Sequence, residues 1–371
     1  IWIMLVMVIV GTSSKWLASR IMCWISKDLR GGTLMMFGLT NAHAAGALAI
    51  VMIGTAPEVN LMDSSVLNGT VMLILFSCII SSFATNEGAR RLALADLDTE
   101  ENQGAWHGKC LVTYSQPDSV SLLTQLALSI RNARIPDSLM GLTVTFNDNE
   151  GEAEGYKEAR RMLEEAVSVA SAAHVDMKTL SRLSTNVAGG ILHTIREYDC
   201  GEVLVCLTDR TTGMPKSSLG PVIDHVIGGT NRQVMAVRLI VPPGTLRRLI
   251  VAVPQKAEYE AGFYKWLEHM CRMGEQFDCL LEFNAHPDTL SHIKSYMWRY
   301  HVSLRAEYIE MALWTKVLSL SQRAGADDLV VFISARPGFI SYKSAFAGLP
   351  LQIHRYFSHT SVILLYPDQW S

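Results

Sequence analysis

The chain has 371 residues, of which 49% are apolar and 18% are charged, and its formal net charge is −3. Its mean hydropathy is +0.20. This apolar fraction excludes an intrinsically disordered or collagen-like chain, and the net charge provides no basic surface for nucleic acid. The length allows two or three domains.

The charges are distributed unevenly along the chain. Residues 1–86 contain seven charged side chains, namely Lys15, Arg20, Lys27, Asp28, Arg30, Glu58 and Asp63. The other 60 of the 67 charged residues follow them. The sequence therefore joins a membrane-like first part to an ordinary soluble second part. It also begins with Ile1, inside an apolar run and without an initiator Met, so we expect a truncated chain.

Three apolar segments are predicted to be membrane-spanning helices, at 1–26, 33–56 and 64–86. At about 1.5 Å per residue, each is long enough to cross a hydrocarbon core of about 30 Å. The segments that follow them differ in charge, with Lys27 and Arg30 in the first, Glu58 and Asp63 in the second, and Arg90 and Arg91 after the third. The positive-inside bias predicts an inner membrane protein with the residues after Arg91 in the cytoplasm.

Polar residues within these segments are candidates for a transport path: Lys15, Asn41 and His43. Lys15 either extends toward the cytoplasmic surface or pairs with a carboxylate, and the predicted spans contain no acidic residue. Small residues in the second span predict close helix packing. For His43, a hydrogen-bonded packing role is favoured over proton transfer.

The order of these segments, and above all the stretch GLTNAHAAGALAIVMIG at 38–54, resembles the C-terminal end of Kef-like monovalent cation/proton antiporters. The resemblance covers about residues 1–90. It implies a longer transporter, of which the last three spans are present. It also implies a lipid membrane, transporter helices upstream of Ile1, a monovalent cation and a proton, and a homodimer as partners. Lys15 matches a basic residue that this family often carries.

Strands and helices alternate twice after residue 108. In the first copy we expect strands at 109–115, 139–146, 177–184, 202–209 and 233–241, and helices at 119–132, 154–174, 187–198 and 219–227. In the second copy we expect strands at 247–254, 278–285, 302–309, 327–336 and 360–367, and helices at 262–273, 288–300, 312–323 and 351–357. This alternation predicts an α/β fold, with a mostly parallel sheet covered on both faces.

The segments EVLVCLTDR and DLVVFISAR occupy equivalent places in the two copies, which indicates an internal repeat. The predicted domains are therefore a membrane domain at 1–90, a linker at 91–108, and two α/β domains at 109–241 and 247–371. Their order of elements resembles the universal stress protein fold in tandem. Such units commonly pack through their last strands.

ATP-binding members of that family carry a glycine-rich loop, G-x2-G-x9-G-[ST], after the fourth strand, and neither copy has this spacing. We therefore favour degenerate domains that dimerise or regulate, without a required cofactor. ATP or another nucleotide is the alternative ligand, with the first copy as the better site. Its candidate residues are Asp118, Lys216, Ser217, Ser218, Gly220, Gly228 and Gly229.

Other chemistry finds little support in the sequence. The seven cysteines lack tight ligand spacing and are expected to be buried thiols. No catalytic cluster or metal motif is present, so we expect no enzyme, and Arg272 is expected on the solvated surface. The favoured function is the C-terminal part of a cation:proton antiporter with a regulatory α/β module. The alternative is a membrane-anchored module that binds a nucleotide or signal without transport.

Overall fold

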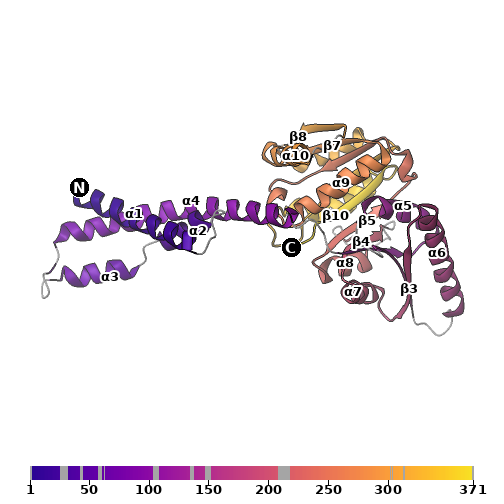
Figure 1. Cartoon of the computed structure of the whole chain (residues 1–371), viewed down its shortest axis with the longest axis horizontal. Coiled ribbons are helices and arrows are strands. Elements are labelled where there is room, and N and C mark those ends of the chain that lie inside the picture. The colour runs from indigo at the N-terminus through magenta and orange to yellow at the C-terminus, as the bar shows by residue number, and fades with distance from the viewer. Residues whose placement is uncertain are drawn as a thin grey trace. The chain divides into compact units, whose positions relative to one another are not determined.

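The computed structural model describes residues 2–25, 32–41, 45–56, 61, 63–102, 108–133, 138–146, 152–207, 218–300, 302, 304–311 and 314–369. The chain divides into two compact units, which are unit 1 at Ile1–Gln103 and unit 2 at Gly104–Ser371 (Figure 1). This division lies inside the predicted linker at 91–108. The linker is nevertheless helical as far as Asn102, because the last helix of unit 1 continues through it.

Unit 1 consists of helices. They are α1 (Trp2–Ile25), α2 (Gly32–Asn41), α3 (Ala45–Gly54) and α4 (Ser64–Asn102). The predicted span at 33–56 corresponds to two short helices, α2 and α3, and residues 42–44 lie outside the description. Within the described residues, one helix, Ser65–Ala89, is long and apolar enough to cross a membrane by length and composition.

Helices α2 and α4 approach each other closely where glycines face the partner helix. A Cβ atom on Gly38 would lie 2.4 Å from the Thr85 backbone nitrogen, and one on Gly88 would lie 2.3 Å from the Met35 nitrogen. Neither position tolerates a side chain without separation of the helices. The small residues therefore allow the close packing that the sequence predicted.

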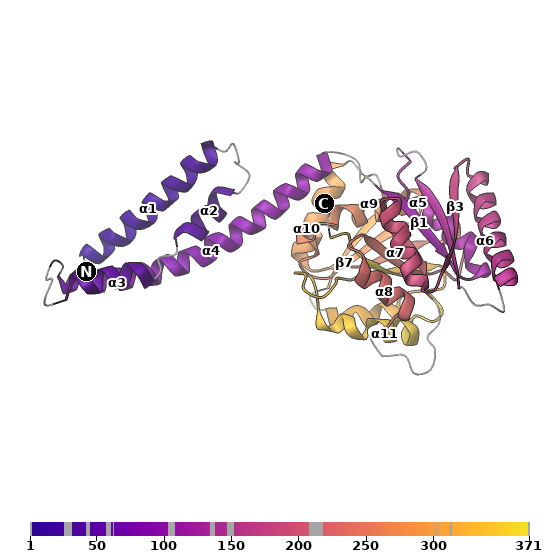
Figure 2. The same ribbon diagram turned by 90° about the horizontal axis from the view of Figure 1, so that it is seen from below.

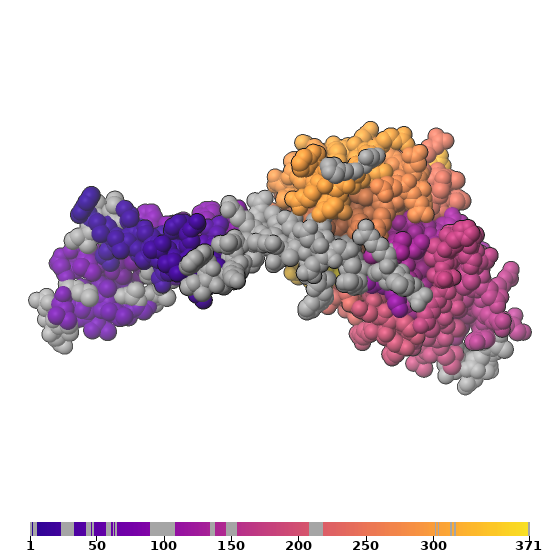
Figure 3. Space-filling view, viewed as in Figure 1, coloured from indigo at the N-terminus to yellow at the C-terminus, as the bar shows by residue number. Residues whose placement is uncertain are grey.

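Unit 2 is built on one ten-stranded sheet in the order β3-β2-β1-β4-β5-β10-β9-β6-β7-β8. The strands of the first half are β1 (Lys109–Tyr114), β2 (Leu139–Phe146), β3 (Met177–Ser184), β4 (Cys200–Cys206) and β5 (Gln233–Arg238). Those of the second half are β6 (Arg248–Ala252), β7 (Leu280–Ala285), β8 (Ala306–Glu310), β9 (Asp328–Ile333) and β10 (Ser361–Tyr366). The two halves form adjoining lobes in the space-filling view (Figure 3).

The two halves have the same topology. Within each half the neighbouring strands are parallel, and the first strand lies between the second and the fourth. The last strands, β5 and β10, pair antiparallel, with Ala236 opposite Leu364. The structure thus has the predicted α/β repeat, joined through its last strands into one continuous sheet.

Helices cover both faces of the sheet, as right-handed crossovers require (Figure 2). One face carries α5 (Val120–Ile130), α6 (Glu152–Ala172), α9 (Phe263–Phe277) and α10 (Pro287–Arg299). The other carries α7 (Val187–Glu197), α8 (Pro221–Gly229), α11 (Leu349–Tyr356) and the 3-10 helix η4 (Trp314–Gln322). The helix predicted at 312–323 is thus a 3-10 helix in its described part.

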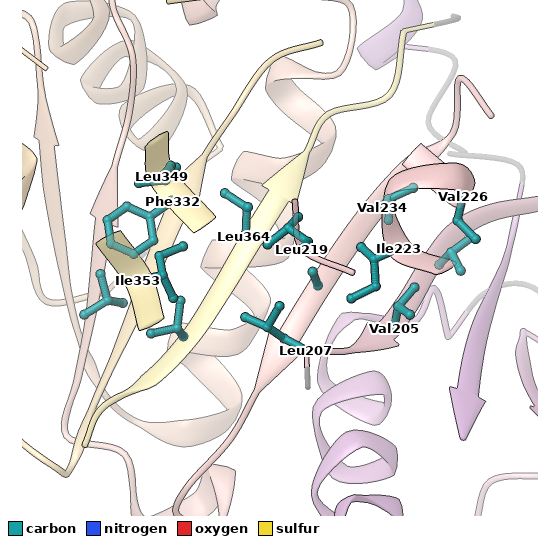
Figure 4. Packing of buried hydrophobic residues seen from close by; sticks show 14 of the residues in the cluster. Val205, Leu207, Leu219, Ile223, Val226, Val234, Phe332, Leu349, Ile353 and Leu364 are labelled. Carbon is teal, nitrogen blue, oxygen red and sulfur yellow. The ribbon is translucent and has the colours of Figure 1, made fainter. Parts of the chain in front are cut away.

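A single hydrophobic core runs beneath α7, α8, η4 and α11. It contains Val205 and Val234 from the first half and Phe332 and Leu364 from the second, all at most 5% exposed (Figure 4). Because their side chains belong to one buried cluster, the two halves are expected to unfold together.

Candidate functional site

A pocket of about 1040 Å³ lies at the carboxyl ends of β1, β2 and β4 in the first half. Thr113, Tyr114 and Ser115 from the end of β1 and Val205 and Cys206 from the end of β4 are among its lining residues. The direction of the strand connections reverses between β1 and β4. In open α/β sheets, ligands bind in the crevice at this reversal, so the pocket is the candidate functional site.

The lining is mainly aliphatic, with hydroxyl groups between the apolar side chains. Thr113 Oγ1 donates a hydrogen bond to the Leu204 carbonyl at 3.0 Å. Thr143 is 1% exposed, and its hydroxyl has no hydrogen-bond partner among the described residues. Within the described lining, the only charged side chain is that of Glu158. The pocket can therefore bind an apolar surface and a few hydrogen-bonding groups.

The N-terminus of α8 forms part of the pocket wall through Gly220 and Pro221. Gly220 has a φ of 116°, in the region that favours glycine. The Asp224 carboxylate accepts hydrogen bonds from the Leu219 backbone nitrogen at 3.0 Å and from the Ser218 hydroxyl. An acidic side chain of the protein itself therefore occupies donors at the start of this helix, where an anionic ligand would otherwise bind.

The structure brings together two of the residues predicted for a nucleotide, Ser218 and Gly220, because the Gly220 nitrogen donates to the Ser218 hydroxyl at 3.1 Å. Asp118 is exposed in the 3-10 helix η1 (Pro117–Ser119) and is not among the lining residues. Gly228 and Gly229 lie at the opposite end of α8 from the pocket. Lys216 and Ser217 lie outside the described residues.

The residues predicted for a transport path have different environments in unit 1. Lys15 is exposed on α1. Asn41, at the end of α2, is fully buried, and its Nδ2 donates to the Ser77 carbonyl at 3.4 Å. Its Oδ1 atom has no hydrogen-bond partner among the described residues. His43 lies outside them.

In the second half, the carboxyl ends of the equivalent strands are covered by other described residues. Ala252 and Val253, at the end of β6, are at most 1% exposed. In the following segment, buried Glu258 accepts a hydrogen bond from the Thr289 hydroxyl at 2.7 Å. Buried Glu260 accepts a hydrogen bond from the Ser341 backbone nitrogen at 2.9 Å. These contacts fasten the loops after β6 and β9 over the position that corresponds to the pocket.

A buried polar cluster joins the two halves on the α9 face of the sheet. Lys265 Nζ, from α9, donates to the Gly201 carbonyl and to the Asp368 carboxylate, both at 2.8 Å, and lies 3.4 Å from Glu202 Oε2. His269 Nδ1 lies 2.8 Å from Gln233 Nε2. Burial raises the pKa of Glu202. The cluster therefore ties α9 of the second half to the start of β4 and β5.

Burial of His269 lowers its pKa well below the ordinary value, and the positive charges of Lys265 and Arg272 act in the same direction. The sequence analysis did not identify this cluster. The sequence nevertheless contained a pattern that indicates it, because Lys265 and His269 are four residues apart among the apolar side chains of Trp266 and Met270. Charged or titratable residues on the apolar stripe of a helix indicate a buried partner.

Two arginines add further bonds between the halves. Arg272 donates to the carbonyls of Ile130 and Arg131 at 3.0 and 3.1 Å, so its prediction as a solvated surface residue is wrong. The Arg336 guanidinium is buried and donates to three carbonyl oxygens, those of Ile227 (3.1 Å), Arg232 (2.9 Å) and Pro367 (2.8 Å). Its burial lowers its pKa to about 10. Arg336 thus fixes the C-terminal part of α8, whose other end lines the pocket.

The described residues contain no group of three or more His, Cys, Asp or Glu side chains that could hold a metal ion. Six of the seven cysteines are buried and Cys78 is exposed. Burial raises the pKa of Cys200 and Cys271 to about 12, which disfavours the reactive thiolate.

The chain is similar to a curated protein, the Na(+)/H(+) antiporter NhaS5 of Synechocystis sp. (strain ATCC 27184 / PCC 6803 / Kazusa). The two are 23% identical over 300 residues, which cover 74% of this chain and 43% of the relative. The chain therefore spans less than half the length of the curated relative that it matches. No model of a protein family matches the chain.

Solved structures similar to this chain include a universal stress protein from Archaeoglobus fulgidus DSM 4304, with 12% identity and a TM-score of 0.48 over 70% of this chain and 97% of that one. They also include a putative universal stress protein from Pseudomonas aeruginosa UCBPP-PA14, with 15% identity and a TM-score of 0.47 over 71% of this chain and 95% of that one. The resemblance to an antiporter that was stated from the sequence is thus found again in a curated protein.

Proposed function

We propose that this chain is the C-terminal portion of a monovalent cation:proton antiporter, in which unit 1 completes the membrane domain and unit 2 regulates transport. The similarity to a Na(+)/H(+) antiporter over 74% of the chain carries this proposal. The chain matches 43% of that relative, so the proposal places the remaining transporter helices before this part.

In this proposal the described helices of unit 1 form three membrane crossings, namely α1, the pair α2 and α3, and the apolar first part of α4. The close approach of α2 and α4 at Gly38 and Gly88 supports a packed bundle. Asn41 is buried and its Oδ1 has no hydrogen-bond partner among the described residues, so we propose it as the residue of unit 1 that faces a cation path.

The predicted spans contain no Asp or Glu. We therefore propose that a carboxylate elsewhere in the longer transporter binds the cation and the proton, and that unit 1 supplies packing and orientation. The charges outside the predicted spans support a cytoplasmic position for unit 2. A multi-pass protein of the plasma membrane, acting as a homodimer, is consistent with this arrangement.

Unit 2 would regulate through its first-half pocket and not through catalysis. α8 connects the pocket, at Gly220 and Pro221, with the second half, through the bond from Arg336 to the Ile227 carbonyl. A ligand that shifts α8 therefore changes how the halves contact each other. Such a change can bias the transporter between its inward- and outward-open states if the two states contact unit 2 differently.

Na⁺/H⁺ exchange in everted membrane vesicles tests the proposal. The protein from the complete reading frame is compared with a version that ends at Gln103, and inserted protein is quantified in the same vesicles. We expect both to exchange Na⁺ for H⁺, with rates that differ by at least about fivefold, the lower end of typical coupling energies. Equal rates and equal pH profiles would refute regulation by unit 2.

The alternative, a membrane-anchored ligand-binding module without transport, is favoured by one observation. The predicted spans carry no acidic residue that could couple a cation to a proton. The same assay separates the two functions, because the alternative predicts no exchange by the protein from the complete reading frame.

A further inference from the structure

We propose that the first-half pocket binds one uncharged, mainly aliphatic small molecule that carries a hydrogen-bonding group, and that it excludes nucleotides. The inference rests on the proposed function only for its regulatory consequence. The binding itself follows from the shape, the lining and the charge of the pocket.

The apolar character of the pocket continues to its opening. Leu142, Ile191 and Val205 lie deep in the wall and are at most 5% exposed. Tyr156 and Leu183 also line the pocket but are 57% and 58% exposed, so apolar surface is left in contact with water. An aliphatic ligand would cover this surface and gain about 25 cal/mol for each Å² removed from water. The volume of about 1040 Å³ is sufficient for a molecule of drug size.

The charge of the site disfavours an anionic ligand. The charged side chain in the described lining is an acid, Glu158, and no described lining residue is Lys, Arg or His. Asp224 adds a second acid, bound to the Leu219 nitrogen and the Ser218 hydroxyl at the start of α8. A nucleotide phosphate at this helix would have to displace Asp224 from these donors or lie next to its negative charge. An uncharged ligand meets neither obstacle.

Hydrogen-bonding capacity is nevertheless available in the wall. The Thr143 hydroxyl, on β2, has no hydrogen-bond partner among the described residues, although Thr143 is 1% exposed. Buried polar groups are almost always paired, because an unpaired one loses its hydration without compensation. A ligand hydroxyl or carbonyl group that reaches Thr143 would supply the pairing. This requirement selects an alcohol or carbonyl compound over a pure hydrocarbon.

Among the described residues, the open pocket lies in the first half. In the second half, the loops after β6 and β9 are held by the bonds from Thr289 to Glu258 and from Ser341 to Glu260. The strand ends beneath them are buried, including Ala252 and Val253. Both halves of the repeat therefore have the same fold, whereas the open pocket lies in the first half.

The test is photoaffinity labelling of the full chain in lipid nanodiscs with a ten-carbon alcohol that carries an alkyl diazirine, followed by peptide mass spectrometry. We expect labelled peptides from β2 and α6. Gly155 on α6 lines the pocket, and a Cβ there meets nothing within 4 Å, so Gly155→Phe fills the opening without a clash. Gly228→Phe is the matched control, since Gly228 has the same free space but does not line the pocket.

Labelling should fall at least about fivefold in Gly155→Phe and stay unchanged in Gly228→Phe. Thr143→Val keeps the side-chain shape, removes the hydroxyl, and should lower labelling about fivefold, the effect of one hydrogen bond. Millimolar MgATP should not compete. Equal labelling of the wild type and Gly155→Phe would overturn the proposal, as would competition by MgATP or labelling of the same peptides by an azido-ATP. Since no transport is measured, failure here leaves the antiporter proposal standing.

Discussion

Replacement of Lys265 by Met removes the single positive charge of a buried cluster while it keeps most of the side-chain volume. The Lys265 side chain is 3% exposed and those of Glu202 and Asp368 are 4% exposed, so water cannot replace the lost ammonium group. Removal of one member of a buried ion pair costs about 3–5 kcal/mol, because the remaining charge stays buried and unpaired. We expect a loss of this size in the free energy of unfolding of unit 2.

The measurement is a urea titration of the full chain in detergent micelles, with hydrogen-exchange mass spectrometry of peptides from β4 and α9. Arg305→Met is the matched control. Arg305 lies 3.4 Å from Asp278, but these side chains are 71% and 97% exposed, so its loss should cost less than about 1 kcal/mol.

A double variant, Lys265→Met with Asp368→Asn, tests the cause of the effect. It should recover at least about 1 kcal/mol, because it removes a buried negative charge that has lost the Lys265 ammonium group. The reasoning is refuted if Lys265→Met costs no more than Arg305→Met, or if the second substitution restores nothing.

Gly262→Ala should destabilise unit 2 by about 1–3 kcal/mol, because the new Cβ would lie 2.5 Å from the Asp368 backbone nitrogen. Gly244→Ala, where nothing lies within 4 Å, should be near neutral, and equal urea midpoints for the two would contradict the prediction. For His269, burial lowers the pKa in the folded state, so below about pH 6.5 the unfolded chain binds a proton that the folded chain does not. Stability should therefore fall as the pH falls from about 6.5, by up to about 1.4 kcal/mol per pH unit. His269→Gln should remove this part of the dependence between pH 7.5 and 5.5, and parallel pH curves for wild type and variant would show that His269 is not its source.

The sequence by itself determined that a sparsely charged, apolar first part is joined to an ordinary α/β second part. It also determined most of the helices and strands of unit 2. Short apolar runs and amphipathic helical spacing are local properties, so the order of strands and helices could be predicted without a structure. The N-terminus of α7 is an example, since a helix was expected from residue 187, and the Asn186 side chain caps it by accepting from the nitrogens of Ala188 and Gly189. The repeat could be recognised for the same reason.

Only the tertiary structure decided which half has an open pocket and what holds the halves together. The pocket opens in one half because loops remote in sequence, tied through Thr289 and Ser341, cover the equivalent edge of the other. In the cluster around Lys265, the bond from Lys265 to Asp368 alone joins residues 103 positions apart. Such contacts depend on which strands lie side by side, and no local pattern of residues specifies that neighbour relationship.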